Sequence, residues 1–224
     1  MKKRTAAALA LFSAAAFSSP RASAADEPPT ILERVQRKFA ENEEIRKLAT
    51  TQPKALAGAG WMTGTWDAVV RTYATKQEGE KVEKATRTTR FELGGRWLLS
   101  RNKGAGPLGE DAVEILGFDP YQRTWRWQFF SSVGRGTNAA LVSSQGWDGN
   151  RLTLSGTFYI WGESADVALR LVKMSDDEYY EIFEEKLPGD VRRPFLEYHY
   201  TRAKEAPAPK PAPAAKPASR PAAK

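Results

Sequence analysis

His199, the chain's one histidine, and Glu197 are the residues best suited to proton or metal chemistry. Residues two apart on a strand share a face, so an inward-facing Glu197–His199 pair could ligate haem iron or act as an acid and base. If Leu196, Tyr198 and Tyr200 face inward instead, His199 is a surface residue, and their apolar character favours this alternative. We therefore predict no catalytic residue and no metal ligand set, and haem as a cofactor only if His199 faces inward.

The absence of cysteine excludes several further kinds of site. It excludes disulfides, cysteine-based zinc or iron–sulfur sites and a cysteine nucleophile. A single histidine also excludes a multi-histidine metal site.

A second group of residues suits the binding of a small molecule. Aromatic side chains on strands would bind an apolar or planar ligand by dispersion and stacking, and an arginine would pair with the carboxylate of a fatty-acid-like ligand. The predicted ligand-binding residues are Trp97, Trp125, Trp127, Phe129, Phe158 and Arg101. Trp161 could extend this set, and the alternative is that the aromatic residues form an ordinary core. Six arginines lie on predicted strands, and some of them could reach into the barrel mouth, while most are predicted to point outward and to pair on the surface with Glu92, Glu114 or Glu181. The six are Arg87, Arg90, Arg96, Arg101, Arg126 and Arg170.

The elements that must position these residues are short strands. From Trp61 onward, Gly, Pro, Asn and Asp recur every ten to fifteen residues between runs rich in Val, Thr, Trp, Tyr and Phe. The short links predict antiparallel neighbours in a meander. The ten predicted strands cover residues 63–74, 83–93, 96–104, 112–118, 124–132, 138–147, 151–160, 165–174, 178–185 and 195–202.

Alternation along several strands predicts how the sheet closes. Trp125, Trp127 and Phe129 share a face opposite Arg126 and Gln128, so one face of the sheet is apolar and the other polar. A mainly β fold, a closed antiparallel up-and-down barrel of about ten strands, buries that face without leaving edges. A β-sandwich is the competing closure.

The segment before the strands is helical in pattern. Thr30 and Glu33 form a capping box, and Ile31, Val35 and Phe39 lie on one stripe. We predict an N-terminal helical segment over residues 25–54, followed by the barrel over residues 55–202.

Both ends of the chain have distinctive compositions. Residues 1–24 combine a cationic start, a short apolar run and a small-x-small site, which predicts a signal peptide and a periplasmic or secreted protein. An uncleaved anchor is the alternative, and no later segment is apolar enough to span a membrane. Residues 203–224 are Pro, Ala and Lys, which predicts a disordered cationic tail that either binds an anionic envelope component or only aids solubility.

The net charge of +7 does not indicate a nucleic-acid partner. The excess of basic residues lies in the predicted signal peptide and tail, and residues 25–202 are nearly neutral. A folded basic surface, which nucleic-acid binding needs, is therefore not predicted.

The ordered motifs WMTGTW, LGGRWLL, ILGFDPYQRTW, SSQGWDGNRLTLSG and LEYHYTR resemble those of a bacterial family with domain of unknown function 1579. The resemblance covers residues 55–202 and implies a lipocalin-type barrel, with no activity attached. Where an aspartate would precede the serine of the glycine turn, this chain has Ser131. A more distant resemblance is to nitrobindin-like haem barrels, through Gly64-Thr65-Trp66, with Ala68 where a further glycine would stand.

Three hypotheses of function follow. The first is an exported, non-enzymatic protein that binds a small apolar or amphipathic molecule in its barrel. The second is an envelope interaction protein that acts through its cationic tail. The third is a haem-binding or enzymatic barrel centred on His199 and Glu197.

Overall fold

The computed structural model describes residues 28–104, 110–133, 139–160 and 162–204. The chain divides into two compact units, Met1–Lys47 and Leu48–Lys224. The predicted signal peptide, and the predicted tail beyond its first two residues, lie outside the described residues. No helix of the described part is long and apolar enough to cross a membrane.

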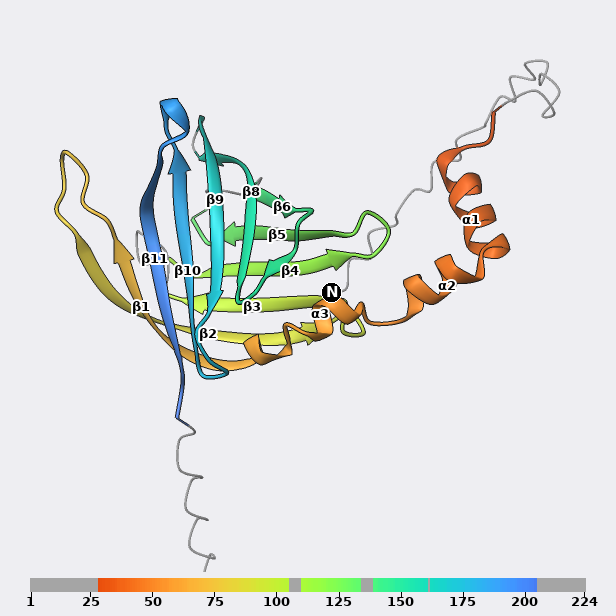
Figure 1. Cartoon of the computed structure of the whole chain (residues 1–224), viewed down its shortest axis with the longest axis horizontal. Helices are drawn as coiled ribbons and strands as arrows, with labels where there is room; N and C mark the ends of the chain where they lie inside the picture. Colours follow the sequence, from red (N-terminus) through yellow and green to blue (C-terminus); the bar gives the residue numbers. More distant parts are fainter. Residues whose placement is uncertain (1–27, 105–109, 134–138, 161, 205–224) are drawn as a thin grey trace, which may run out of the picture. The chain divides into compact units, whose positions relative to one another are not determined.

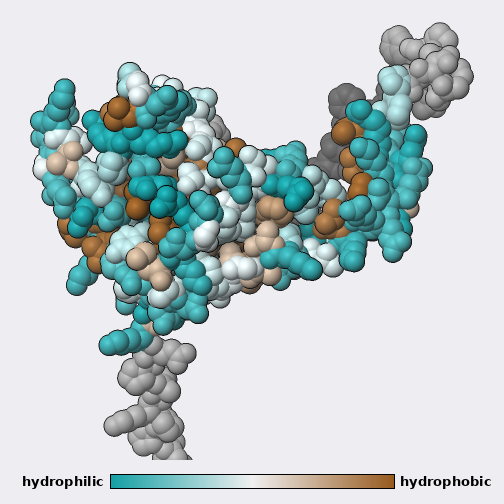
Figure 2. All heavy atoms as spheres, viewed as in Figure 1, coloured by the Kyte–Doolittle hydropathy of each residue, from teal (hydrophilic) through white to brown (hydrophobic). Residues whose placement is uncertain are grey.

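The predicted helical segment forms helices α1 (Ile31–Glu41) and α2 (Glu43–Thr50). The predicted capping box starts α1: the Glu33 amide donates to the Thr30 hydroxyl, and the Glu33 carboxylate accepts from the Thr30 amide at 2.8 Å. Asn42 ends α1, and its side-chain oxygen accepts from the Ile45 amide at 3.0 Å, which caps α2. The stripe on α1 is exposed and forms the row of apolar residues visible on that helix in Figure 2.

The predicted barrel is confirmed, with every neighbouring pair of strands antiparallel (Figure 1). Among the described residues the ring order is β6-β5-β4-β3-β2-β1-β11-β10-β9-β8, and it closes where β6 pairs with β8. The strands are β1 (Gly64–Thr72), β2 (Lys81–Glu92), β3 (Trp97–Lys103), β4 (Ala112–Asp119), β5 (Thr124–Ser131), β6 (Ala139–Ser143), β7 (Trp147–Asp148), β8 (Arg151–Ile160), β9 (Glu163–Lys173), β10 (Glu178–Lys186) and β11 (Arg192–Arg202).

The predicted strand over residues 138–147 is wrong in one respect. It forms two strands, β6 and the short extra strand β7, which pairs with β8. Gly146 between them has φ +72°, in the left-handed region that interrupts an extended strand.

A short helical segment fills one end of the barrel, the capped end. Helix α3 (Lys54–Ala57) and the 3₁₀ helix η1 (Gly60–Met62) place Leu56 and Met62 in the core beside Trp66. The Trp66 indole is fully buried at this end and donates to the Met62 carbonyl at 2.9 Å. The Arg202 guanidinium lies 4.2 Å from the Trp66 ring centroid. This cation–π contact packs the end of β11 against Trp66 at the capped end.

The other end of the barrel is the distal end. There β8 passes into β9, and β10 passes into β11 through the 3₁₀ helix η2 (Pro188–Asp190). A bulge between Phe183 and Glu184 shifts the pairing of β10 with β11 on this side.

Gly156 provides a test of barrel closure. A Cβ at this position would lie 2.5 Å from the Ala140 carbonyl oxygen and 3.1 Å from the Leu141 side chain, where β8 meets β6. Because the first of these atoms is backbone, Gly156→Ala must push the two strands apart, and we expect a loss of about 1 to 3 kcal/mol in the free energy of unfolding. Urea denaturation would measure the loss. Gly79→Ala is the control, since a Cβ there meets nothing within 4 Å; equal midpoints for the two variants would contradict the closure.

Candidate functional site

The last strand decides which way the histidine faces. Tyr198 and Tyr200 are buried on the inner face of β11, so Glu197 and His199 lie on the outer face. His199 Nε2 lies 2.8 Å from Glu178 Oε1, and the imidazole stacks on the Tyr180 ring with 4.4 Å between centroids. This confirms the surface interpretation.

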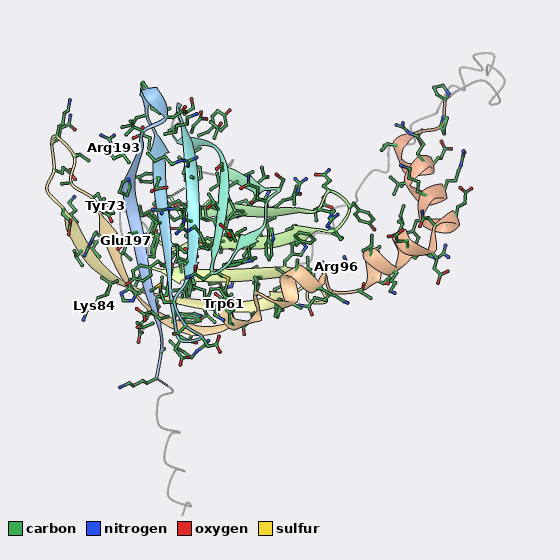
Figure 3. All side chains as sticks on the ribbon, viewed as in Figure 1. Trp61, Tyr73, Lys84, Arg96, Arg193 and Glu197 are labelled. Carbon is green, nitrogen blue, oxygen red and sulfur yellow. The ribbon has the colours of Figure 1, made fainter. Side chains whose placement is uncertain are left out.

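Glu197, the other half of the predicted pair, is also turned away from the interior. It accepts a hydrogen bond of 3.0 Å from the Tyr73 hydroxyl, and the two side chains are labelled near the β1–β11 edge in Figure 3. A haem inside the barrel with His199 as its ligand therefore does not fit these residues. Within the described ranges, no group of three or more His, Cys, Asp or Glu residues could hold a metal ion.

A buried guanidinium lies in the barrel interior. Arg87, on β2, donates through Nη2 to Glu114 Oε1 at 2.6 Å and to Glu181 Oε2 at 2.8 Å. Its Nη1 also donates to Glu181, and its Nε donates to Asn102 Oδ1 at 2.7 Å. The Arg87 side chain is only 1% exposed. The expectation that Glu114 and Glu181 pair with arginines on the surface is therefore wrong, because their strands turn both carboxylates inward, and Arg87 is an arginine that reaches the interior.

Neutral polar groups complete this network around the two carboxylates. Glu114 accepts from the Asn102 amide at 2.7 Å and from the Trp127 indole at 3.0 Å. Tyr179 accepts from Arg87 at 3.0 Å, and the Arg87 guanidinium lies 4.2 Å from the Tyr200 ring centroid. These hydrogen bonds offset the cost of burying the three charges, because a buried charge without a hydrogen-bond partner is strongly destabilising. We call Arg87, Asn102, Glu114, Tyr179, Glu181 and Tyr200 the interior network.

The interior network holds two carboxylates against one guanidinium. The pKa of Glu181 is raised to about 7, chiefly by burial, while Arg87 opposes the shift and the nearby Glu114 carboxylate contributes to it. Burial also opposes the charge on Arg87, but Glu114 and Glu181 keep its pKa well above the ordinary value. The network therefore retains its cation and takes up a proton at Glu181 near neutral pH.

The predicted aromatic residues do not all lie on one face. Trp125, Trp127, Phe129 and Phe158 face the interior, and the Trp127 ring stacks on Phe129 and Phe158 with centroid separations of 5.9 and 6.0 Å. Trp125 lies nearer the capped end, edge-on to Trp147 at 6.2 Å. The structure therefore brings Trp127, Phe129 and Phe158 together as an aromatic layer on the distal side of the network.

Trp97 and Arg101 lie on the outer face of β3, because Leu98, Ser100 and Asn102 take the inner face. Trp97 covers Gly117, where a Cβ would lie 2.2 Å from the indole ring. Arg101 is exposed and lines an outer groove of about 330 Å³ with Lys103 and Phe130. Trp161 lies outside the described residues.

A pocket of about 340 Å³ lies at the distal end, beside the aromatic layer. We call it the distal pocket, and its lining residues are Phe158, Glu163, Ser164, Ala165, Val167, Glu185 and Phe195. Phe158 and Val167 are also part of the buried core, and Phe195 packs against that core 6.2 Å from the Phe183 ring. The distal pocket therefore has an apolar floor continuous with the core and carboxylates among its other lining groups.

These features define a closed antiparallel β-barrel with a charged interior network and a partly apolar pocket at one end. Residues 60–202 match the family described as "Protein of unknown function (DUF1579)", and the chain belongs to that family.

The solved structures that match this chain include the following two. The crystal structure of Rv2717c from M. tuberculosis has a TM-score of 0.46 and 11% identity, covering 68% of this chain and 99% of that one. A redesigned β-barrel, b11L5F_LGL, has a TM-score of 0.28 and 10% identity, covering 69% and 99% of the two chains. No protein with a curated description matches the chain.

Proposed function

We propose that this barrel is a binding protein for a small apolar or amphipathic molecule, which it holds in the distal pocket. The distal pocket carries this proposal, because its floor of Phe158, Val167 and Phe195 offers apolar surface where the core reaches the end of the barrel. Its volume, about 340 Å³, falls within the range of small-molecule sites in proteins.

The aromatic layer supports the same proposal. Phe158 is 8% exposed and lies between the distal pocket and Trp127, with ring planes only 6° from parallel to the indole. A wall held in this way presents a fixed apolar surface to a ligand, so little ordering is needed when the ligand binds. On its other side Trp127 donates to Glu114 of the interior network, which holds the indole in place.

Phe158→Ala tests the proposed site. We expect it to weaken the binding of 1-decanol, an uncharged amphipathic probe, by at least about tenfold, because a ligand in the distal pocket loses an aromatic wall. Isothermal titration calorimetry would measure the affinities. Tyr159→Ala is the matched control, since Tyr159 is the next residue on β8 and is 55% exposed; equal weakening by both changes, or no decanol binding to the unchanged protein, would overturn the proposal.

We also propose that the protein is exported, on the pattern of residues 1–24. Expression in a Gram-negative host should then yield a mature chain that starts near Asp26 in the periplasm or medium. Intact-mass measurement of the fractions would detect it, and a full-length chain confined to the cytoplasm would contradict export.

A further inference from the structure

The inner wall of the barrel is acidic from the level of Arg87 to the distal end. Register places Glu83 opposite the buried Val70, and Glu185 opposite the buried Val167, so both lie on the inner face. Among the described residues, the inner-wall carboxylates on this side are Glu83, Glu110, Glu114, Glu163, Glu181 and Glu185, and the cations are Lys81, Arg87 and Arg193. The inner wall on this side therefore carries more carboxylates than cations although the whole chain is basic, and two of these carboxylates, Glu163 and Glu185, line the distal pocket.

The three inner-wall cations are already held by carboxylates. Arg87 is enclosed by the interior network, and Lys81 Nζ lies 2.8 Å from Glu78. Arg193, labelled at the distal part of β11 in Figure 3, lies 2.8 Å from Glu185. None of them lines the distal pocket.

The pocket's own charged groups are both acidic. Glu163 has no ion pair to another described residue, and it stands two residues before Ala165 on the same face of β9. Glu185 pairs with Arg193, yet its side chain is still 31% exposed, and it lines the pocket. An anionic headgroup placed here would meet two carboxylates without a free cation, whereas a cationic one would meet its complement.

From this charge pattern and the apolar floor, we infer that the distal pocket takes a cationic amphiphile. Its apolar body lies on Phe158, Val167 and Phe195, and its ammonium-type head lies at Glu163 and Glu185. This inference rests on the proposed function and adds the class of ligand to it. The inferred ligand is cationic, whereas Arg101 as a binding residue implied a ligand with a carboxylate; Arg101 lies on the outer face.

Three probes with the same ten-carbon chain distinguish the proposed binding function from the inferred preference for a cationic ligand. Decylammonium, 1-decanol and decanoate would be titrated into the full chain at pH 7.5, below their aggregation concentrations, with calorimetric readout. We expect decylammonium to bind at least about tenfold more tightly than decanol, and decanoate to bind more weakly than decanol. The double substitution Glu163→Gln/Glu185→Gln should remove most of the preference for decylammonium while leaving decanol binding within about twofold.

Asp166→Asn is the matched control for the carboxylates. Asp166 lies between Ala165 and Val167 on β9, but it is exposed and accepts from the Thr157 hydroxyl at 3.1 Å on the outer face. It should leave the preference unchanged. If decanol or decanoate binds as tightly as decylammonium and Phe158→Ala weakens that binding, the cationic class is overturned and the binding function stands. If none of the three probes binds, or Phe158→Ala changes none of them, both fall.

Discussion

Arg87→Met is expected to lower the free energy of unfolding by roughly 3 to 5 kcal/mol at pH 8. The substitution removes the guanidinium between Glu114 and Glu181 and leaves two buried carboxylates, 4% and 1% exposed, to repel each other. Methionine keeps much of the volume, so the loss arises from charge rather than from a cavity. Chemical denaturation followed by tryptophan fluorescence would measure it.

The matched control is Arg90→Met on the same strand. Arg90 lies on the outer face, its side chain is 64% exposed, and its ion pair with Glu92 is at the surface, so we expect a change within about 0.5 kcal/mol. The triple variant Arg87→Met/Glu114→Gln/Glu181→Gln should recover most of the loss, because no uncompensated charge remains. If Arg87→Met were as stable as Arg90→Met, the interior network would not hold the barrel together.

The strands and their closure could be predicted because each of their signals is local. In TWRWQFF the alternation of large apolar and polar side chains fixes both the strand and its inner face, and β5 has the predicted parity. The short links between strands leave few alternatives to antiparallel neighbours, and an apolar face must close on itself. The same parity argument favoured a surface position for His199, because Leu196, Tyr198 and Tyr200 form the more apolar face.

The interior network could not be predicted in this way. The sequence of β2, KVEKATRTTRFE, has no apolar alternation, so its hydrophobic pattern does not tell that Ala85, Arg87 and Thr89 form its inner face. Only the pairing of Ala85 with Ala68, a contact far apart in sequence, settles the parity. One signal was available: small residues flank Arg87, and an arginine that faces a barrel interior needs such space.

Two of the predicted ligand-binding residues, Trp97 and Arg101, were placed wrongly because the inner face of β3 is also ambiguous in the sequence. In WLLSRNK, Leu98 and Leu99 are adjacent apolar residues, so either face could be the inner one. The structure puts Leu98, Ser100 and Asn102 inside, because Asn102 bonds both Arg87 and Glu114 there. Trp97 and Arg101 consequently face outward. The distal pocket also depends on Phe195, whose position is set by the bulge in the β10–β11 pairing, and the sequence has no marker for that bulge.

Stability should fall as pH rises from about 5 to 8, and Glu181 is the expected cause. Its pKa is raised from 4.5 to about 7 in the folded barrel, chiefly by burial. The folded state therefore binds a proton that the unfolded state has lost between these two values, and stability decreases with pH wherever the folded state binds more protons. The contribution is fully present below about pH 4.5 and is lost as pH rises through about 7. A shift of this size corresponds to about 3 kcal/mol.

Glu181→Gln isolates this effect, because glutamine cannot ionise and leaves Arg87 paired with Glu114 alone. We expect the variant to be less stable than the unchanged protein at pH 5, where the protonated acid keeps its hydrogen bonds, and to close or reverse that gap at pH 8. The difference between the two proteins, measured by denaturation at half-unit steps of pH, cancels the contributions that both proteins share. Asp148→Asn, at an exposed position, should keep the original slope. A difference that stays constant from pH 5 to 8 would mean that Glu181 is ionised throughout, and that the interior network carries its second negative charge unprotonated beside Arg87.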